Sequence, residues 1–178
     1  MNFDRLVENY LKESYTDATP QQVGEQFIRD FLSRYEYNLS GKGHLSSIWV
    51  TKMFCEWIKQ YGVGGENTTV IYFVWPQKET VKDLKRSGIL PKDYKSQGES
   101  HIAPIFKNHI LDFTIGQFIP DRQLLVTPVA QWKNVYGKYG YGTNSFKGQE
   151  IFIGTYETVA QETGMAHCDK SSLSKRKM

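Results

Sequence analysis

The sequence predicts a single α+β domain in which helices come first and an antiparallel sheet follows. Apolar residues recur at helical spacing near the start, β-branched and aromatic runs come later, and no internal repeat or change of composition divides the chain. The 178 residues are 39% hydrophobic and 14% aromatic, which is enough for one packed core. We therefore assign residues 1–165 to one domain and the polar, basic residues 166–178 to a C-terminal tail.

Three helices are expected before the sheet. Residues 3–11 repeat apolar side chains every three or four positions, which is typical of an amphipathic helix. A second helix begins after Thr19, which can cap the first turn, while Gln22 can complete a capping box. The third helix, residues 45–62, is apolar on most sides, which indicates a helix packed in the centre of the domain.

The later part of the chain predicts the sheet. Residues 68–76, "TTVIYFVWP", form a continuous apolar run that is typical of a strand covered on both faces. Residues 77–100 are polar and predict a mobile flap. Residues 101–118 predict a hairpin, residues 127–142 a short helix that becomes a glycine-tyrosine loop, and residues 150–156 another strand.

A two-residue turn at Lys107 and Asn108 would set the register of the hairpin, with Phe106 opposite His109. Because side chains alternate along a strand, His109 then falls on one face, where a structural role is expected. The residues that share the other face are His101, Ala103, Asp112 and Thr114.

His101 and Asp112 are diagonal neighbours in this register, about 7 Å apart at the backbone, so their side chains can meet. A carboxylate fixes the tautomer of an imidazole and stabilises the imidazolium, as a general base requires. The same spacing also fits a hairpin histidine beside a solvated aspartate at a strand end. Both interpretations stay open at this point.

Three segments together resemble a known family. They are "GKGHLSS" at residues 41–47, the strand that begins with His101, and "DFTIGQF" at residues 112–118. Over residues 41–118 they are similar to the transglutaminase-like branch of the papain-like cysteine enzymes. The resemblance implies a papain-like or transglutaminase-like fold, in which the central helix packs on the antiparallel sheet.

The resemblance also implies a cysteine at the start of the central helix, activated by His101 and oriented through Asp112. Members of the family cleave, deamidate or cross-link amides through a thioester. The family's cysteine falls on Gly43 in this sequence. Cys55 cannot replace it, because twelve helical residues carry Cys55 about 18 Å further along. Ser46 lies near the helix start, but a serine is far less acidic than a thiol.

The predicted catalytic positions are therefore Gly43, His101 and Asp112, in a cleft between the start of the third helix and the hairpin. His44, Ser46 and Gln117 are expected to contact the substrate. The expected function is a cysteine-dependent amide hydrolase or acyltransferase, of the protease, deamidase or transglutaminase type, acting on a peptide or protein. The alternative is a catalytically silent binding protein that uses the same cleft. Gly43 fits either a lineage that lost its nucleophile and kept its fold or a parent protein whose cysteine was replaced.

Composition and motifs argue against other classes. No segment approaches the roughly 20 apolar residues of a membrane span, and the N-terminus has no signal-peptide pattern, so a soluble, cytoplasmic protein without a membrane partner is expected. Two cysteines provide neither a disulfide framework nor a metal-ligand spacing, and no metal or cofactor is expected. The net charge of +3 is small and is partly due to the basic tail. The tyrosine-rich loop 135–148 could stack bases, but no nucleic-acid-binding motif accompanies it, so nucleic-acid binding is not expected.

Overall fold

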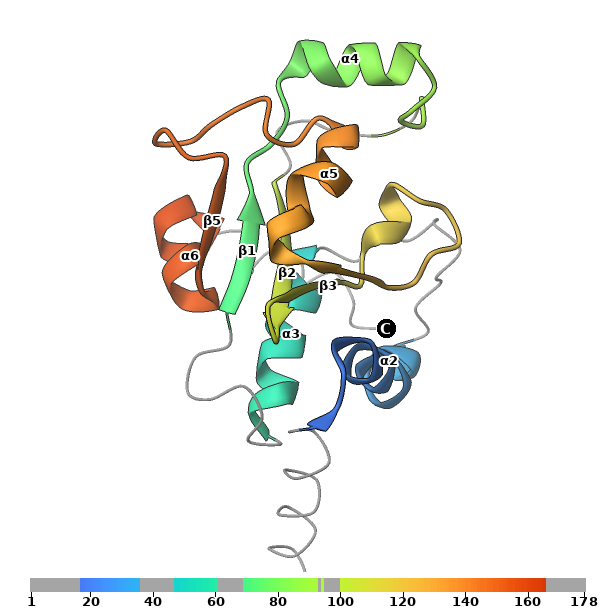
Figure 1. Cartoon of the computed structure of the whole chain (residues 1–178), viewed down its shortest axis with the longest axis vertical. Helices are drawn as coiled ribbons and strands as arrows, with labels where there is room; N and C mark the ends of the chain where they lie inside the picture. Colours follow the sequence, from blue (N-terminus) through green and yellow to red (C-terminus); the bar gives the residue numbers. More distant parts are fainter. Residues whose placement is uncertain (1–16, 36–46, 61–68, 93, 95–99, 166–178) are drawn as a thin grey trace, which may run out of the picture.

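The computed structural model describes residues 17–35, 47–60, 69–92, 94 and 100–165 (Figure 1). In these residues the protein has five α-helices and a five-stranded antiparallel sheet, which confirms the predicted α+β class. The α-helices are α2 (Pro20–Asp30), α3 (Ser47–Gln60), α4 (Lys78–Arg86), α5 (Trp132–Tyr136) and α6 (Tyr156–Thr163). The strands are β1 (Thr69–Phe73), β2 (His101–Phe106), β3 (His109–Asp112), β4 (Leu125–Pro128) and β5 (Ile151–Thr155). Single 3-10 turns are η1 (Leu32–Tyr35), η2 (Ile115–Gln117), η3 (Val129–Gln131) and η4 (Gly137–Tyr139).

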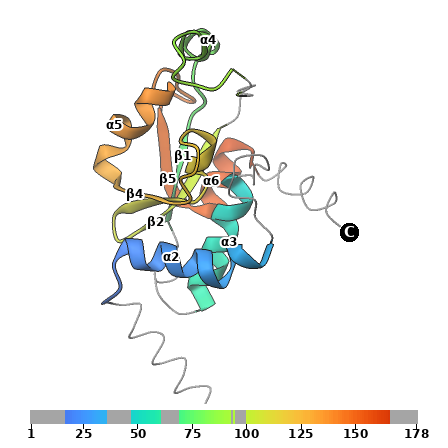
Figure 2. The ribbon, with the colours of Figure 1, turned by 90° about the vertical axis from the view of Figure 1, so that its right-hand side faces the viewer.

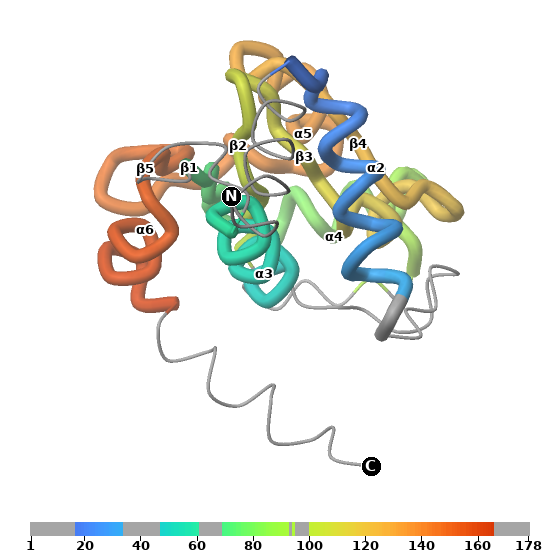
Figure 3. Tube along the Cα trace, turned by 90° about the horizontal axis from the view of Figure 1, so that it is seen from below, coloured from blue at the N-terminus to red at the C-terminus, as the bar shows by residue number. Residues whose placement is uncertain are grey.

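The strand order across the sheet is β4-β3-β2-β1-β5, and every neighbouring pair is antiparallel. Strand β1 therefore lies between β2, the next strand in the sequence, and β5, the last one. Its side chains are buried on alternate faces, which confirms the prediction of a strand covered on both sides. Figure 3 shows α6, α3 and α2 along one face of the sheet and α5 on the other.

The face of the sheet under α2, α3 and α6 is filled by two clusters of apolar side chains. Phe27 of α2 meets Phe54 and Trp57 of α3 there, with ring centroids 5.2 and 5.3 Å away. The second cluster lies toward β1 and α6 and includes Cys55, Val70 and Val159. The predicted central helix is therefore present as α3, and it contacts β2 directly (Figure 2).

The opposite face carries a third cluster, which surrounds the start of β2. Ile71 and Phe73 of β1 pack there with Tyr136 of α5 and Val81 of α4. Gly140 adopts a positive φ of 89°, and a β-carbon at this position would lie 3.1 Å from both Pro76 and Thr80. A glycine is therefore needed for the loop after α5 to approach the start of α4 so closely.

The second predicted helix begins as expected. Thr19 Oγ1 accepts a hydrogen bond from the Gln22 N–H at 3.2 Å, and Gln22 Oε1 accepts one from the Thr19 N–H at 2.8 Å. This reciprocal capping box satisfies two N–H groups at the helix end. The predicted third helix is also present, with α3 covering Ser47–Gln60 of the expected residues 45–62. The expected helix over residues 3–11 lies outside the described residues.

Three elements differ from the expectation. Within residues 77–100, predicted as a flap, Lys78–Arg86 form the helix α4, because its Val81 is anchored in the core. Strand β4 was not predicted, since its four residues end at a proline. Helix α6 was also missed, although Thr155 caps it and Gly164 ends it in the left-handed conformation.

Candidate functional site

The hairpin of β2 and β3 positions the two residues that the sequence singles out. Lys107 and Asn108 have positive φ angles of 46° and 60°, as a two-residue turn with the twist of the strands requires. Phe106 pairs with His109, and Ile105 with Ile110, so the predicted register is confirmed. His101 therefore begins β2 where Asp112 ends β3.

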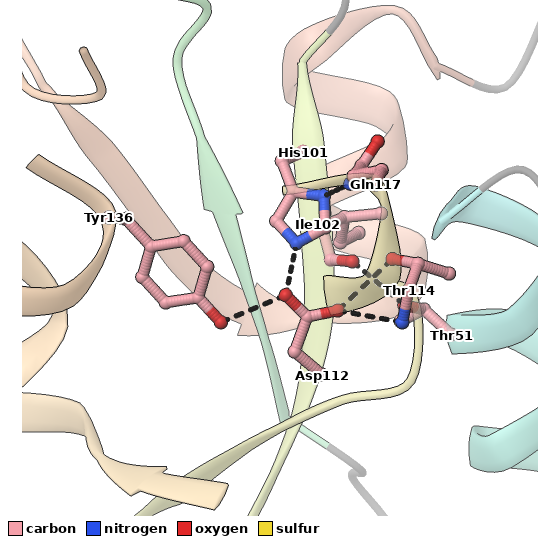
Figure 4. Close-up of polar contacts among 7 residues, drawn as sticks. All are labelled: Thr51, His101, Ile102, Asp112, Thr114, Gln117 and Tyr136. Atoms are coloured by element: carbon pink, nitrogen blue, oxygen red, sulfur yellow. Dashed lines mark hydrogen bonds and ion pairs between the residues drawn. The ribbon is translucent and has the colours of Figure 1, made fainter. Parts of the chain in front are cut away.

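His101 and Asp112 are in direct contact. His101 Nε2 lies 2.7 Å from Asp112 Oδ2, and both side chains are only 1% exposed (Figure 4). The prediction that the hairpin places the imidazole within hydrogen-bond reach of the carboxylate is confirmed. The alternative of a solvated aspartate at a strand end is wrong for this chain.

Asp112 accepts hydrogen bonds at both of its oxygens. The Thr114 N–H and the Thr114 hydroxyl donate to Oδ1 at 2.9 and 3.0 Å, while His101 and the Tyr136 hydroxyl share Oδ2 (Figure 4). The chain leaves the strand at Asp112 and turns through η2. Thr114 therefore lies beyond β3 and bonds to the carboxylate, whereas the predicted hairpin extended the strand through Thr114 on the face of His101.

The other imidazole nitrogen of His101 faces Gln117. Gln117 Nε2 lies 2.9 Å from His101 Nδ1, and Gln117 is half-buried. Because an ionised carboxylate can only accept, the proton of a neutral ring sits on Nε2, and Nδ1 accepts from the Gln117 amide. Gln117 thus lies at the site, and its amide contacts the histidine.

Aromatic rings enclose the imidazole. The rings of Phe73 and Phe118 have centroids 5.7 and 5.4 Å from that of His101, and those of Tyr136 and Tyr141 lie 5.7 and 6.1 Å away. These residues come from β1, the end of η2, helix α5 and the loop after η4. The histidine is therefore held between the sheet and the loop after α5, on the face away from α3.

The electrostatics of the site favour an ionised Asp112. Burial acts to raise the pKa of Asp112, but the neighbouring His101 and the hydrogen bonds from His101, Thr114 and Tyr136 outweigh it and lower the pKa. Burial, together with the charge of Asp112, raises the pKa of Tyr136 well above its ordinary value. Tyr136 therefore remains a protonated donor to the carboxylate.

Helix α3 reaches the same part of the sheet from the other face. The Thr51 hydroxyl donates to the carbonyl of Ile102, the residue next to His101, at 3.2 Å (Figure 4). Ile102 packs beside α3 while His101 packs beside α5. Gly43, His44 and Ser46 lie outside the described residues, so the contact of the expected nucleophile position with His101 stays a prediction.

Two other expectations concern single residues. Cys55 is buried, and burial raises the pKa of its thiol to about 12, so it cannot supply a thiolate near neutral pH. His109 Nδ1 lies 2.8 Å from the carbonyl of Lys107, a local contact in the hairpin turn that fits the expected structural role.

Tyr136 belongs to the site and was not predicted from the sequence. It comes from a five-residue helix, 24 positions after Asp112. The tyrosine-rich loop 135–148 carries no nucleic-acid motif and is typical of a flexible loop at the rim of a cleft, and nothing in its spacing points to the carboxylate. The one available signal was that a buried aspartate with a histidine partner needs further donors.

Two other features, a metal site and a membrane-spanning helix, were sought in the described residues. Among them, no group of three or more His, Cys, Asp and Glu side chains is placed to hold a metal ion. None of the helices in the described ranges has the length and apolar character needed to cross a membrane.

Comparison with known proteins identifies no matching family model, no matching curated protein and no matching solved structure. The class that the fold and the site define is therefore an α+β protein with a buried, fully hydrogen-bonded histidine–aspartate pair.

Proposed function

We propose that this chain is a papain-like or transglutaminase-like domain whose His101 and Asp112 are the base and its orienting carboxylate. The supported reaction class is cysteine-dependent hydrolysis or transfer of an amide on a peptide or protein. Gly43 occupies the nucleophile position in this sequence. The chain with glycine at that position cannot form the thioester itself.

The observation that carries the proposal is the arrangement of the imidazole. Its Nε2 is fixed by Asp112 at 2.7 Å, so the lone pair of Nδ1 is available to accept a proton from a donor, now the Gln117 amide. A general base that serves a thiol needs this geometry, because one nitrogen must be anchored and the other must be basic.

The chemistry would follow from these roles. A thiol at position 43 would transfer its proton to Nδ1, and the thiolate would attack the amide carbon. The imidazolium would return the proton to the leaving nitrogen as the C–N bond breaks, leaving a thioester. Water or an amine would then displace the thiolate and complete hydrolysis or transfer.

The decisive experiment restores the thiol. We expect the Gly43→Cys protein, in a Cys168→Ser background, to react with iodoacetamide with a pH midpoint below the value of about 8.5 for a free cysteine. The imidazole would stabilise the thiolate, so adding His101→Gln should return the midpoint to the free value. The buried Cys55 remains as an unreactive internal thiol.

Lys42→Cys provides the matched control, because it moves the installed thiol by one position. We expect it to titrate like a free cysteine. If Gly43→Cys, Lys42→Cys and the His101→Gln double variant show the same pH profile, His101 does not serve position 43, and the catalytic proposal fails. Circular dichroism would verify that each variant is folded.

A second candidate function is a binding protein that has kept the scaffold. The observation that favours it is the enclosure of His101, which is 1% exposed and has a partner at each ring nitrogen. A glycine at position 43 agrees with it. A free-cysteine titration of the installed thiol, in a folded protein, would favour this function over the first.

A further inference from the structure

Tyr136 brings an O–H donor to the same carboxylate oxygen that His101 contacts. Its hydroxyl donates to Asp112 Oδ2 at 3.0 Å, beside the 2.7 Å contact of His101 Nε2. The tyrosine is fully buried, and its ring centroid lies 4.3 Å from that of Phe73. Because the ring has its own packing, the hydroxyl can be removed while most of the packing stays in place.

We propose that Tyr136 is a positioning residue that keeps His101 as a neutral imidazole with an unprotonated Nδ1. Two donors at Oδ2 divide the negative charge of the carboxylate between them. That division limits how strongly Asp112 stabilises a second proton on the ring. The neutral ring is the form that can accept a proton from a nucleophile.

The inference deepens the proposed function and rests on it for its catalytic meaning. Its structural basis is separate, since the three side chains come from different elements and meet in one buried place. His101 belongs to β2, Asp112 to β3 and Tyr136 to α5 (Figure 4). The contact is therefore made by the tertiary fold and does not follow from neighbouring positions in the sequence.

Within the described part of the chain, the titratable groups that face Tyr136 come from two places. His101 and Asp112 approach it from the sheet, and Tyr139 and Tyr141 follow it in the chain. Burial and the charge of Asp112 raise the pKa of the Tyr136 phenol well above its ordinary value. The hydroxyl therefore remains a donor throughout the pH range in which a histidine and a thiol exchange a proton.

The experiment reads the protonation of the imidazole directly. Nitrogen-15 NMR of the full chain separates neutral from doubly protonated rings, and the His101→Gln spectrum identifies His101 among the four histidines. At fixed neutral pH, Tyr136→Phe should raise the ratio of doubly to singly protonated His101 several-fold. Tyr139→Phe is the matched control, because it removes a hydroxyl from a ring that stacks on Phe118, and it should leave the ratio unchanged.

A second variant gives the opposite sign and retains the hydroxyl. Site-specific replacement of Tyr136 by 3,5-difluorotyrosine makes the phenol a stronger donor at nearly the same size, so the doubly protonated fraction should fall. If the phenylalanine and difluorotyrosine variants both match the parent protein, Tyr136 has only a packing role and the inference is overturned. If Tyr136→Phe does not fold, the difluorotyrosine result alone decides.

The two proposals fail in different ways. The NMR ratio needs no cysteine, so it can respond to Tyr136 even if the Gly43→Cys thiol titrates like a free one. In that case the histidine–aspartate–tyrosine contact stands and the nucleophile position is wrong. If His101→Gln shifts the pH midpoint of the thiol but Tyr136→Phe leaves the protonation ratio of His101 unchanged, the proposed function stands and the role of Tyr136 is wrong.

Discussion

Asp112 is the residue that organises the candidate site. It is almost completely buried, yet it remains the acceptor for four hydrogen bonds from three residues. Removing one partner of a buried, charged contact is costly because the remaining groups lose their hydrogen bonds without regaining water. Asp112 therefore matters for stability whether or not the protein is a catalyst.

This arrangement predicts a specific acid sensitivity. Burial alone would raise the pKa of Asp112, but His101 and the hydrogen bonds lower it below its unfolded value of about 3.9. The carboxylate thus contributes stability above about pH 4, and that contribution is lost as the pH falls through the lower folded pKa. Urea unfolding of the parent protein should therefore show an unfolding free energy that decreases as the pH falls below about 4. In Asp112→Asn this decrease should be smaller, because the titrating carboxylate is gone.

The same variant should cost about 3–5 kcal/mol of unfolding free energy at neutral pH. Asp83→Asn makes the same exchange on the exposed side of α4, beside Arg86, and should change the unfolding free energy by less than about 0.5 kcal/mol. An Asp112→Asn protein as stable as the parent would mean that the carboxylate charge is not needed at this place.

The histidine and the aspartate could be predicted from the sequence because one hairpin carries both. A turn at Lys107 and Asn108 fixes the register, and alternation then puts His101 and Asp112 on one face. Tyr136 could not be predicted in the same way. Its position depends on how α5 crosses the sheet, which no local pattern of residues encodes.

The hairpin turn itself gives a prediction for an element. Asn108 has a φ of 60°, a left-handed conformation that asparagine tolerates and that costs a residue with an ordinary β-carbon about 1–2 kcal/mol. Asn108→Ala should therefore lower the unfolding free energy by about 1 kcal/mol, while Asn108→Gly should not. Equal stabilities of the two variants in urea would show that the turn is not under this constraint.

The elements that sequence patterns missed share a physical reason. Helix α4 has a single fully buried residue, Val81, so its charged surface resembles a loop in composition. Strand β4 is stabilised by pairing with β3, and α6 by packing on β5 and β1. Tertiary contacts determine these three elements, whereas capping and periodicity were sufficient for α2 and α3.

At the scale of the whole molecule, Phe27 connects the helical layer to the sheet. Its ring contacts those of Phe54 and Trp57 on α3 and that of Phe113 after β3, with the Phe27 and Phe113 centroids 4.9 Å apart. Phe27→Ala should lower the unfolding free energy by about 3–5 kcal/mol, because it leaves a cavity where two layers meet.

Phe146→Ala is the matched truncation on a half-buried side chain in the loop before β5. It should cost only about 1 kcal/mol. Thermal or urea unfolding measures both variants, and similar losses would contradict the view that the α2–α3 layer is part of the main core.

Strand order has a consequence for biosynthesis. β1 pairs with β2 on one edge and with β5 on the other, and Ile71 meets Ile153 across the second edge. On the ribosome, β1 is made before β5, so the apolar segment "TVIYF" has an open hydrogen-bonding edge until residues 151–155 have been added. A nascent chain that stalls before residue 151 would leave that edge open to pairing with another strand, and we expect such a chain to aggregate more readily than the complete one.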